Sequence, residues 1–198
     1  MKIDINKLAK LNQLAKEGAN KVAENLSQLL GIDVEMKITK IDFVTLTDLP
    51  QEIGNDETVG IHLSFTGLPS GYLVVLFPTE SAKKVASLLL QGIGEEINDN
   101  DEFTDMDRSA ISEVANILTS SFIDGWANVL KTEIDISTPQ MVHDMGSAVI
   151  DPILIELAKE VDHAFVFNSH IHAKDKDIKC QIYVFPELNK LMEAIEKL

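Results

Sequence analysis

The chain has 198 residues and a formal net charge of −15, and 45% of its residues are apolar and 25% charged. That composition is typical of a globular domain, while the acidity argues against nucleic acid and anionic membrane surfaces as partners, because both would repel it. There is one cysteine, no apolar targeting segment at the N-terminus and no run of about 18 apolar residues. We therefore expect a cytoplasmic protein with no membrane insertion and no internal disulfide.

The first half of the chain predicts a long helix, three strands and a second helix. Residues 5–30 carry apolar side chains at helical spacing, with Gly31 as a plausible end. Alternating or continuous apolar runs then predict strands, and the glycines and proline at 67–71 predict a hairpin turn between the last two. The strands are expected at residues 34–46, 58–66 and 71–77, and the second helix at 81–90.

An acidic passage separates the two halves. Residues 95–107 hold seven carboxylates, and residues 95–104 are expected to form a solvated connection rather than a site. Thr104 and Asp107 are spaced as an N-cap and its partner, so a helix is predicted to begin there.

The order of elements then recurs. A long helix is predicted at 105–130, strands at 132–137, 163–173 and 178–185, and a last helix from Leu188 onward. The ending Leu73-Val-Val-Leu-Phe-Pro78 is echoed by Gln181-Ile-Tyr-Val-Phe-Pro186, and each precedes a helix. We predict one α+β domain over residues 1–198 with pseudo-two-fold halves at about 5–92 and 105–198, whose sheets pair back to back or edge to edge. Residues 140–158 have no counterpart in the first half and are expected to be an inserted helical segment.

The predicted helix at 105–130 carries the strongest functional signal. Glu113 and Asn116 are three residues apart, so their side chains leave one helix face about one turn apart. A carboxylate beside a carboxamide can grip a lysine and orient a water. The alternative is that both residues simply belong to a solvated helix face.

The spacing around this pair resembles a family signature. Ser109, Glu113, Asn116 and Pro139 fit the pattern Asp/Ser-x3-Glu-x2-Asn-x22-Pro, which is similar to that of the CheC, CheX and FliY chemotaxis phosphatases. The resemblance extends to Asn25-Leu-Ser-Gln-Leu-Leu-Gly31, Gly71-Tyr-Leu-Val-Val-Leu-Phe-Pro78 and Pro139-Gln-Met-Val-His-Asp-Met145. Members of that family consist of two similar halves.

The resemblance implies a phosphatase acting on the aspartyl phosphate of the response regulator CheY, in two-component signalling. Asn116 would orient the attacking water, Glu113 would dock the regulator's lysine, and Ser109 would contact the partner. No cofactor of the chain's own is implied, because the Mg²⁺ belongs to the regulator.

Family members with two sites carry a second Glu-x2-Asn on the first helix. Alignment through Leu26-Ser-Gln-Leu-Leu30 puts Gln13 and Lys16 at those positions. An ammonium group repels a lysine and accepts no hydrogen bond, so this second site is expected to be degenerate. Glu17 and Asn20 have the right spacing one turn later and are interpreted as exposed helix residues.

The alternative function is that of a mainly non-catalytic adaptor that binds CheD, phosphorylated CheY or both. Such proteins also bind the receptor deamidase CheD, through an aspartate that Asp144 matches in position. Asp144 could instead cap or solvate a local helix.

Other residues carry weaker signals. His170 and His172 share a face of one predicted strand but have no third metal ligand nearby in sequence, so no metal site is predicted. Cys180 lies in an apolar run and is expected to be a buried strand thiol. Trp126 is expected to belong to the core.

Overall fold

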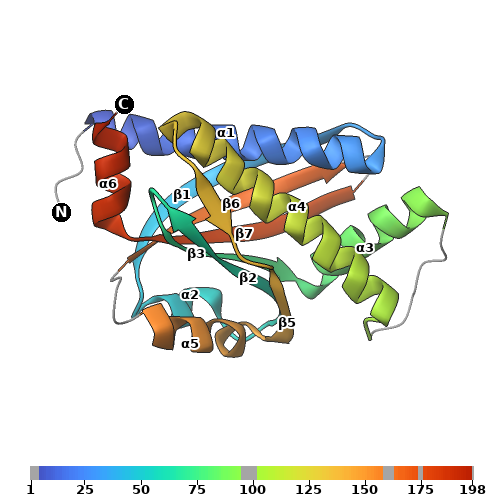
Figure 1. Ribbon diagram of the computed structural model, residues 1–198. Coiled ribbons are helices and arrows are strands. Elements are labelled where there is room, and N and C mark those ends of the chain that lie inside the picture. The colour runs from blue at the N-terminus through green and yellow to red at the C-terminus, as the bar shows by residue number, and fades with distance from the viewer. Residues whose placement is uncertain (1–4, 95–101, 158–162, 174–175, 198) are drawn as a thin grey trace.

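The computed structural model describes residues 5–94, 102–157, 163–173 and 176–197 of the chain (Figure 1). Helices and strands follow one another as α1 (Ile5–Leu30), β1 (Val34–Thr45), α2 (Leu49–Ile53), β2 (Glu57–Gly67), β3 (Gly71–Pro78), α3 (Thr79–Ile93), α4 (Asp105–Leu130), β4 (Ile134–Ile136), β5 (Gln140–Met145), α5 (Gly146–Leu157), β6 (His163–Ala173), β7 (Lys176–Pro186) and α6 (Leu188–Glu196). None of the helices in these ranges is long and apolar enough to cross a membrane.

The strands of the described part form one antiparallel sheet in the order β1-β6-β7-β3-β2-β4, with β5 also paired to β2. Its centre is the pairing of β3 with β7, where Gly71 lies opposite Pro186. The strands of the two halves therefore meet edge to edge. The first strands are exchanged, because β1 pairs with β6 of the second half while β4 and β5 pair with β2 of the first.

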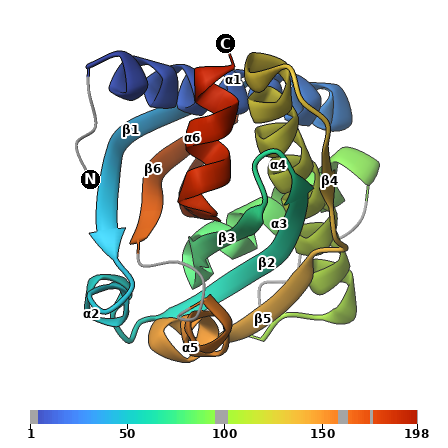
Figure 2. The ribbon, with the colours of Figure 1, turned by 60° about the vertical axis from the view of Figure 1, so that its left-hand side comes forward.

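Each face of the sheet is covered by helices, and the strand residues alternate between two cores. On β3, Leu73 and Val75 belong to the larger core beneath α1, α3, α4 and α6, while Val74 belongs to the smaller core against α2 and α5. Figures 1 and 2 show α2 and α5 together on the opposite side of the sheet from α1 and α4. A sheet buried on both faces explains why its central strands are continuous apolar runs.

The two long helices pack directly on each other where they cross above the sheet (Figure 1). At the crossing Gly125 of α4 lies against Gly18 of α1, and a Cβ at Gly125 would stand 2.6 Å from the Cα of Gly18. A Cβ at Gly18 would likewise collide with the ring of Phe122. The close approach therefore depends on two residues that lack side chains.

The predicted α+β class is confirmed, and the predicted helices and strands occur with ends that shift by a few residues. The predicted hairpin turn at 67–71 is also confirmed, and it holds a cis Leu68–Pro69 peptide bond. Trp126 is fully buried in the larger core, as expected. The division into halves around an acidic connection stays a prediction, since residues 95–101 lie outside the described residues.

The predicted helical insertion at 140–158 is wrong in its first part. Residues 140–145 form strand β5, which pairs with β2, and only the segment from Gly146 to Leu157 is helical. Polar side chains occur on both faces of β5, at Gln140, His143 and Asp144, so the sequence shows no alternation typical of a strand. Helix α5 of this segment packs against a helix of the first half, the short α2, which the sequence analysis missed.

Replacement of Gly125 by alanine tests the helix crossing. We expect Gly125→Ala to lower the free energy of unfolding by about 1–3 kcal/mol, because the new methyl group forces two backbones apart. The matched control is Gly92→Ala in α3, where a Cβ meets nothing within 4 Å and the gain in helix propensity should raise that free energy by about 0.5–1 kcal/mol. Urea unfolding measures both, and a Gly125→Ala protein as stable as the parent would contradict the close crossing.

Candidate functional site

Helix α4 begins at a complete capping box, as Thr104 and Asp107 predict. The N–H of Asp107 donates to Oγ1 of Thr104 at 3.1 Å, and the N–H of Thr104 donates to Oδ2 of Asp107 at 2.8 Å. Two backbone donors at the helix start are thereby satisfied, which fixes where the helix begins. The start of α4 is therefore fixed, and with it the direction in which each later side chain leaves the helix.

Ser109, Glu113 and Asn116 are exposed on one side of α4. They stand four and then three residues apart, so they follow one line along the helix surface. The opposite side is buried, with Ile111 and Leu118 fully enclosed and Val114 4% exposed. Ile117, next to the buried Leu118, is only half-buried at the edge of the core.

No hydrogen bond or ion pair occupies the side chains of Glu113 and Asn116 among the residues that the structure describes. The backbone carbonyl of Asn116 does accept hydrogen bonds, from Oγ1 of Thr119 at 3.1 Å and from Oγ of Ser120 at 2.7 Å. These bonds hold the backbone one turn beyond the pair while the carboxamide stays directed to solvent. Both side chains are therefore available to a partner molecule.

Strand β5 lies beside the first half of α4 and accounts for the position of Pro139. This proline directly precedes β5, whose Met141 places its Sδ 3.7 Å from Oγ of Ser112, one residue before Glu113. Two residues on, His143 stacks edge-on against Phe103 with ring centroids 4.9 Å apart. The 22 residues between Asn116 and Pro139 in the sequence pattern thus lead from helix α4 to the strand whose Met141 contacts that helix.

Asp144 is exposed but belongs to the other face of β5. Met141 packs on the larger core, near α4, whereas Val142 packs on the smaller core, near α5. By the strand alternation Asp144 shares the face of Val142, and its Oδ1 accepts the N–H of Met145 at 2.7 Å. The structure does not bring Asp144 together with Glu113 and Asn116.

The sequence model of the CheC-like family matches residues 106–143, which include Ser109, Glu113, Asn116 and Pro139. The chain is 42% identical over 200 residues to a Halobacterium salinarum protein named putative CheY-P phosphatase CheC1, with 99% of this chain and 98% of that protein covered. The chain belongs to the CheC-like family.

Two further similarities agree with this assignment. The Bacillus subtilis protein named CheY-P phosphatase CheC is 26% identical over 192 residues, with 95% of this chain and 90% of that protein covered. The crystal structure of Thermotoga maritima FliY superposes with a TM-score of 0.76 at 17% sequence identity and covers 100% of this chain and 99% of that chain. The fold is therefore one that CheC-like proteins share with FliY.

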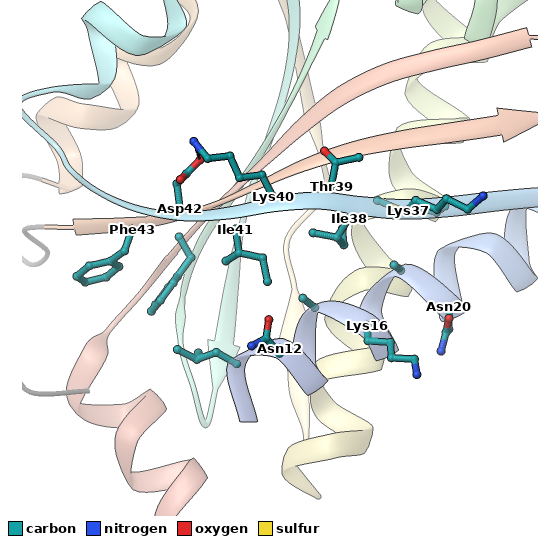
Figure 3. Close-up of a pocket in the computed structure, with 15 residues that line it drawn as sticks. Asn12, Lys16, Asn20, Lys37, Ile38, Thr39, Lys40, Ile41, Asp42 and Phe43 are labelled. Atoms are coloured by element: carbon teal, nitrogen blue, oxygen red, sulfur yellow. Dashed lines mark ion pairs between the residues drawn. The ribbon is translucent and has the colours of Figure 1, made fainter. Parts of the chain in front are cut away.

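The first helix carries no equivalent pair of carboxylate and carboxamide at the aligned positions. Gln13 and Lys16 are exposed on α1, and so are Glu17 and Asn20. Lys16 and Asn20 both line a groove between α1 and β1 (Figure 3). The sequence analysis did not find this groove, because it is formed by backbone placement rather than by a residue pattern.

The remaining candidates do not form a site. Burial raises the pKa of the Cys180 thiol to about 12, and with 2% exposure the thiol is an inert strand residue, as expected. Nδ1 of His170 lies 3.5 Å from Oδ2 of Asp177, and His172 is exposed nearby. Among the described residues no three His, Cys, Asp or Glu side chains are grouped to hold a metal ion.

Proposed function

We propose that the protein dephosphorylates the aspartyl phosphate of the chemotaxis response regulator CheY. The observation that carries the proposal is the pair of exposed side chains, Glu113 and Asn116, one turn apart on α4 and without partners in the described part of the chain. The names of the Halobacterium and Bacillus relatives support CheY-P as the substrate.

The chemistry needs little more than this pair. An acyl phosphate has a good leaving group, and the regulator's own Mg²⁺ neutralises charge on the phosphoryl oxygens, so the missing element is a water in line with the phosphorus. The carboxamide of Asn116 accepts a hydrogen bond from water while staying uncharged, so it orients the water without repelling the phosphoryl group. The carboxylate of Glu113 pairs with the regulator's active-site lysine and sets the depth of docking.

Ser109 completes the docking line. It is exposed one turn before Glu113 on the same side of α4, where its hydroxyl can donate to or accept from the surface of the regulator. Because all three side chains project from one capped helix, the regulator meets a rigid surface rather than a loop.

Asn116→Ala tests the role of the carboxamide. We expect the variant to lose about 100-fold in the rate of phosphate loss from phosphorylated CheY, because the attacking water is no longer held. Stability should change by less than about 0.5 kcal/mol, since the position is exposed in a helix. The rate is measured at saturating protein, after subtraction of the regulator's own dephosphorylation.

The matched control is Asn128→Ala, which removes an exposed carboxamide from the same helix outside the pair. It should keep the activity of the parent. Equal losses in the two variants would show that the carboxamide of Asn116 has no special role.

The two long helices should contribute unequally. The double change Gln13→Ala and Lys16→Ala should alter the dephosphorylation rate by less than about twofold, since neither residue supplies a carboxylate for docking or an uncharged acceptor at the position of the carboxamide. The assay is the one used for Asn116→Ala. A loss as large as that of Asn116→Ala would place a second active centre on α1.

A second role as an adaptor is favoured by the position of Asp144. The residue is exposed and lies on the face of β5 away from α4, so a protein such as CheD could bind there while CheY occupies the outer side of α4. Exposed elements at the edge of a sheet are common places for partner contacts.

Two substitutions separate a charge contact from local structure. Asp144→Ala removes both the charge and the acceptor for the N–H of Met145, whereas Asp144→Asn keeps an oxygen that can accept it. We expect both variants to weaken CheD binding by about tenfold while dephosphorylation of CheY is unchanged. Binding lost only in Asp144→Ala would assign the residue to the local turn, and unchanged binding in both would remove it from the interface.

A further inference from the structure

Strand β1 is an edge of the sheet. Within the described residues it pairs with β6 alone, so the backbone groups on its outer side have no strand partner. The register shifts between Ile38 and Lys40, where Oγ1 of Thr39 donates to the carbonyl of Asn168 at 3.0 Å. An open strand edge is a template onto which another extended chain can add.

A groove of about 660 Å³ runs beside this edge, between β1 and α1 (Figure 3). Ile38 and Ile41 point from the strand toward the helix, and Asn12 lies across from them (Figure 3). The floor is apolar and is completed by Leu11, Ala15, Ala19, Met36 and Phe165. An apolar floor next to unpaired backbone groups suits a chain with alternating side chains.

The opposite edge of the sheet shows that such a groove is not a necessary result of the fold. There β5 lies against α4, and Met141 reaches Ser112 while Phe103 packs on His143. These side chains lie between the helix and the edge strand. On the α1 side small residues, Ala15 and Ala19, face the strand instead and leave the space open.

The charged residues of the groove differ in sign from the chain as a whole. Its lining contains three lysines, Lys16, Lys37 and Lys40, against one carboxylate, Asp42, in a chain of net charge −15. Lys40 pairs with Asp42 at 2.8 Å, and Lys37 pairs outside the lining with Glu35, also at 2.8 Å. Both lysines of these pairs are exposed, so they can exchange a partner for an incoming anion, and Lys16 has no partner in the part of the chain that is described.

We propose that this groove binds an acidic, extended segment of a partner protein as an added strand on β1. The backbone of the segment would pair with the open edge of β1, and its alternate apolar side chains would enter the groove. Its carboxylates would lie on the other face of the added strand, beside Lys37 and Lys40 of β1. A helical segment would leave the strand edge unpaired.

The test uses a fluorescein-labelled octapeptide of alternating valine and glutamate as the probe, with fluorescence anisotropy on the full chain. We expect the peptide to bind, and the peptide with lysine in place of glutamate to bind at least about tenfold more weakly. A form with N-methyl groups on alternate amides, which cannot pair with the strand edge, should lose binding to a similar extent. Amide hydrogen exchange in β1 should slow when the acidic peptide is bound.

Three variants locate the binding on the molecule. Lys37→Glu reverses a charge at the groove, and Asn20→Trp places a large side chain at an exposed position of its lining. Both should weaken binding about tenfold. The matched control, Lys179→Glu, reverses the charge of an exposed strand lysine outside the groove and should bind as the parent does.

Four results would overturn the proposal: no binding of the acidic peptide, equal binding of the lysine peptide, binding that is insensitive to N-methylation, or parent-like binding by Asn20→Trp. A dimer that forms without peptide and is disrupted by Asn20→Trp would identify a second copy as the occupant instead. Circular dichroism confirms that each variant is folded before its binding is interpreted.

Discussion

The pairing of β3 with β7 is the contact on which the rest of the structure depends. It joins the two halves at the centre of the sheet, and both strands are buried on both faces, with Val75 and Ile182 in one core and Val74 and Tyr183 in the other. The exchange of β1, β4 and β5 between the halves makes each half incomplete without the other. Because both faces must be covered, the helices have few places to lie, and the two longest must cross on the same face.

That crossing sets the orientation of the proposed site. Gly18 and Gly125 let α1 and α4 approach until their backbones touch, and Phe122 and Ile111 turn the apolar side of α4 to the core. The remaining side of the helix must then face solvent, and Glu113 and Asn116 lie on it. The proposed site thus results from core packing on the opposite side of the helix, and it requires no strained loop.

The sequence predicts the fold well wherever one face of an element is uniformly apolar. The long helices and central strands have such faces, and the cap at Thr104 is specified by its own side-chain chemistry. Strand β5 and helix α2 escaped prediction for two reasons: the outer residues of β5 are polar or only half-buried, and α2 has five residues, too few for a helical period to show.

The residues of the candidate site fall into the same two groups, those that the sequence places and those that it does not. Exposure of Glu113 and Asn116 follows from helical periodicity, so a sequence suffices to place them on one face. The separation of Asp144 from that pair depends on which face of β5 each residue occupies, and this required the pairing of β5 with β2. The groove beside β1 depends on two alanines being small where other residues could have filled the space, and such an absence has no sequence pattern.

The two ends of the sheet differ in a consistent way. At the β5 end, Met141 and the paired rings of His143 and Phe103 lie beside α4, and the outer side of that helix carries the exposed Glu113 and Asn116. At the β1 end α1 carries Gln13 and Lys16 in place of a carboxylate and a carboxamide, and lysines border an open groove. Since β1 and β5 lie at opposite edges of one sheet, partners bound at the two ends would not compete for the same residues. The proposed regulator surface on α4 and the proposed strand groove at β1 would therefore let one rigid sheet hold two proteins together.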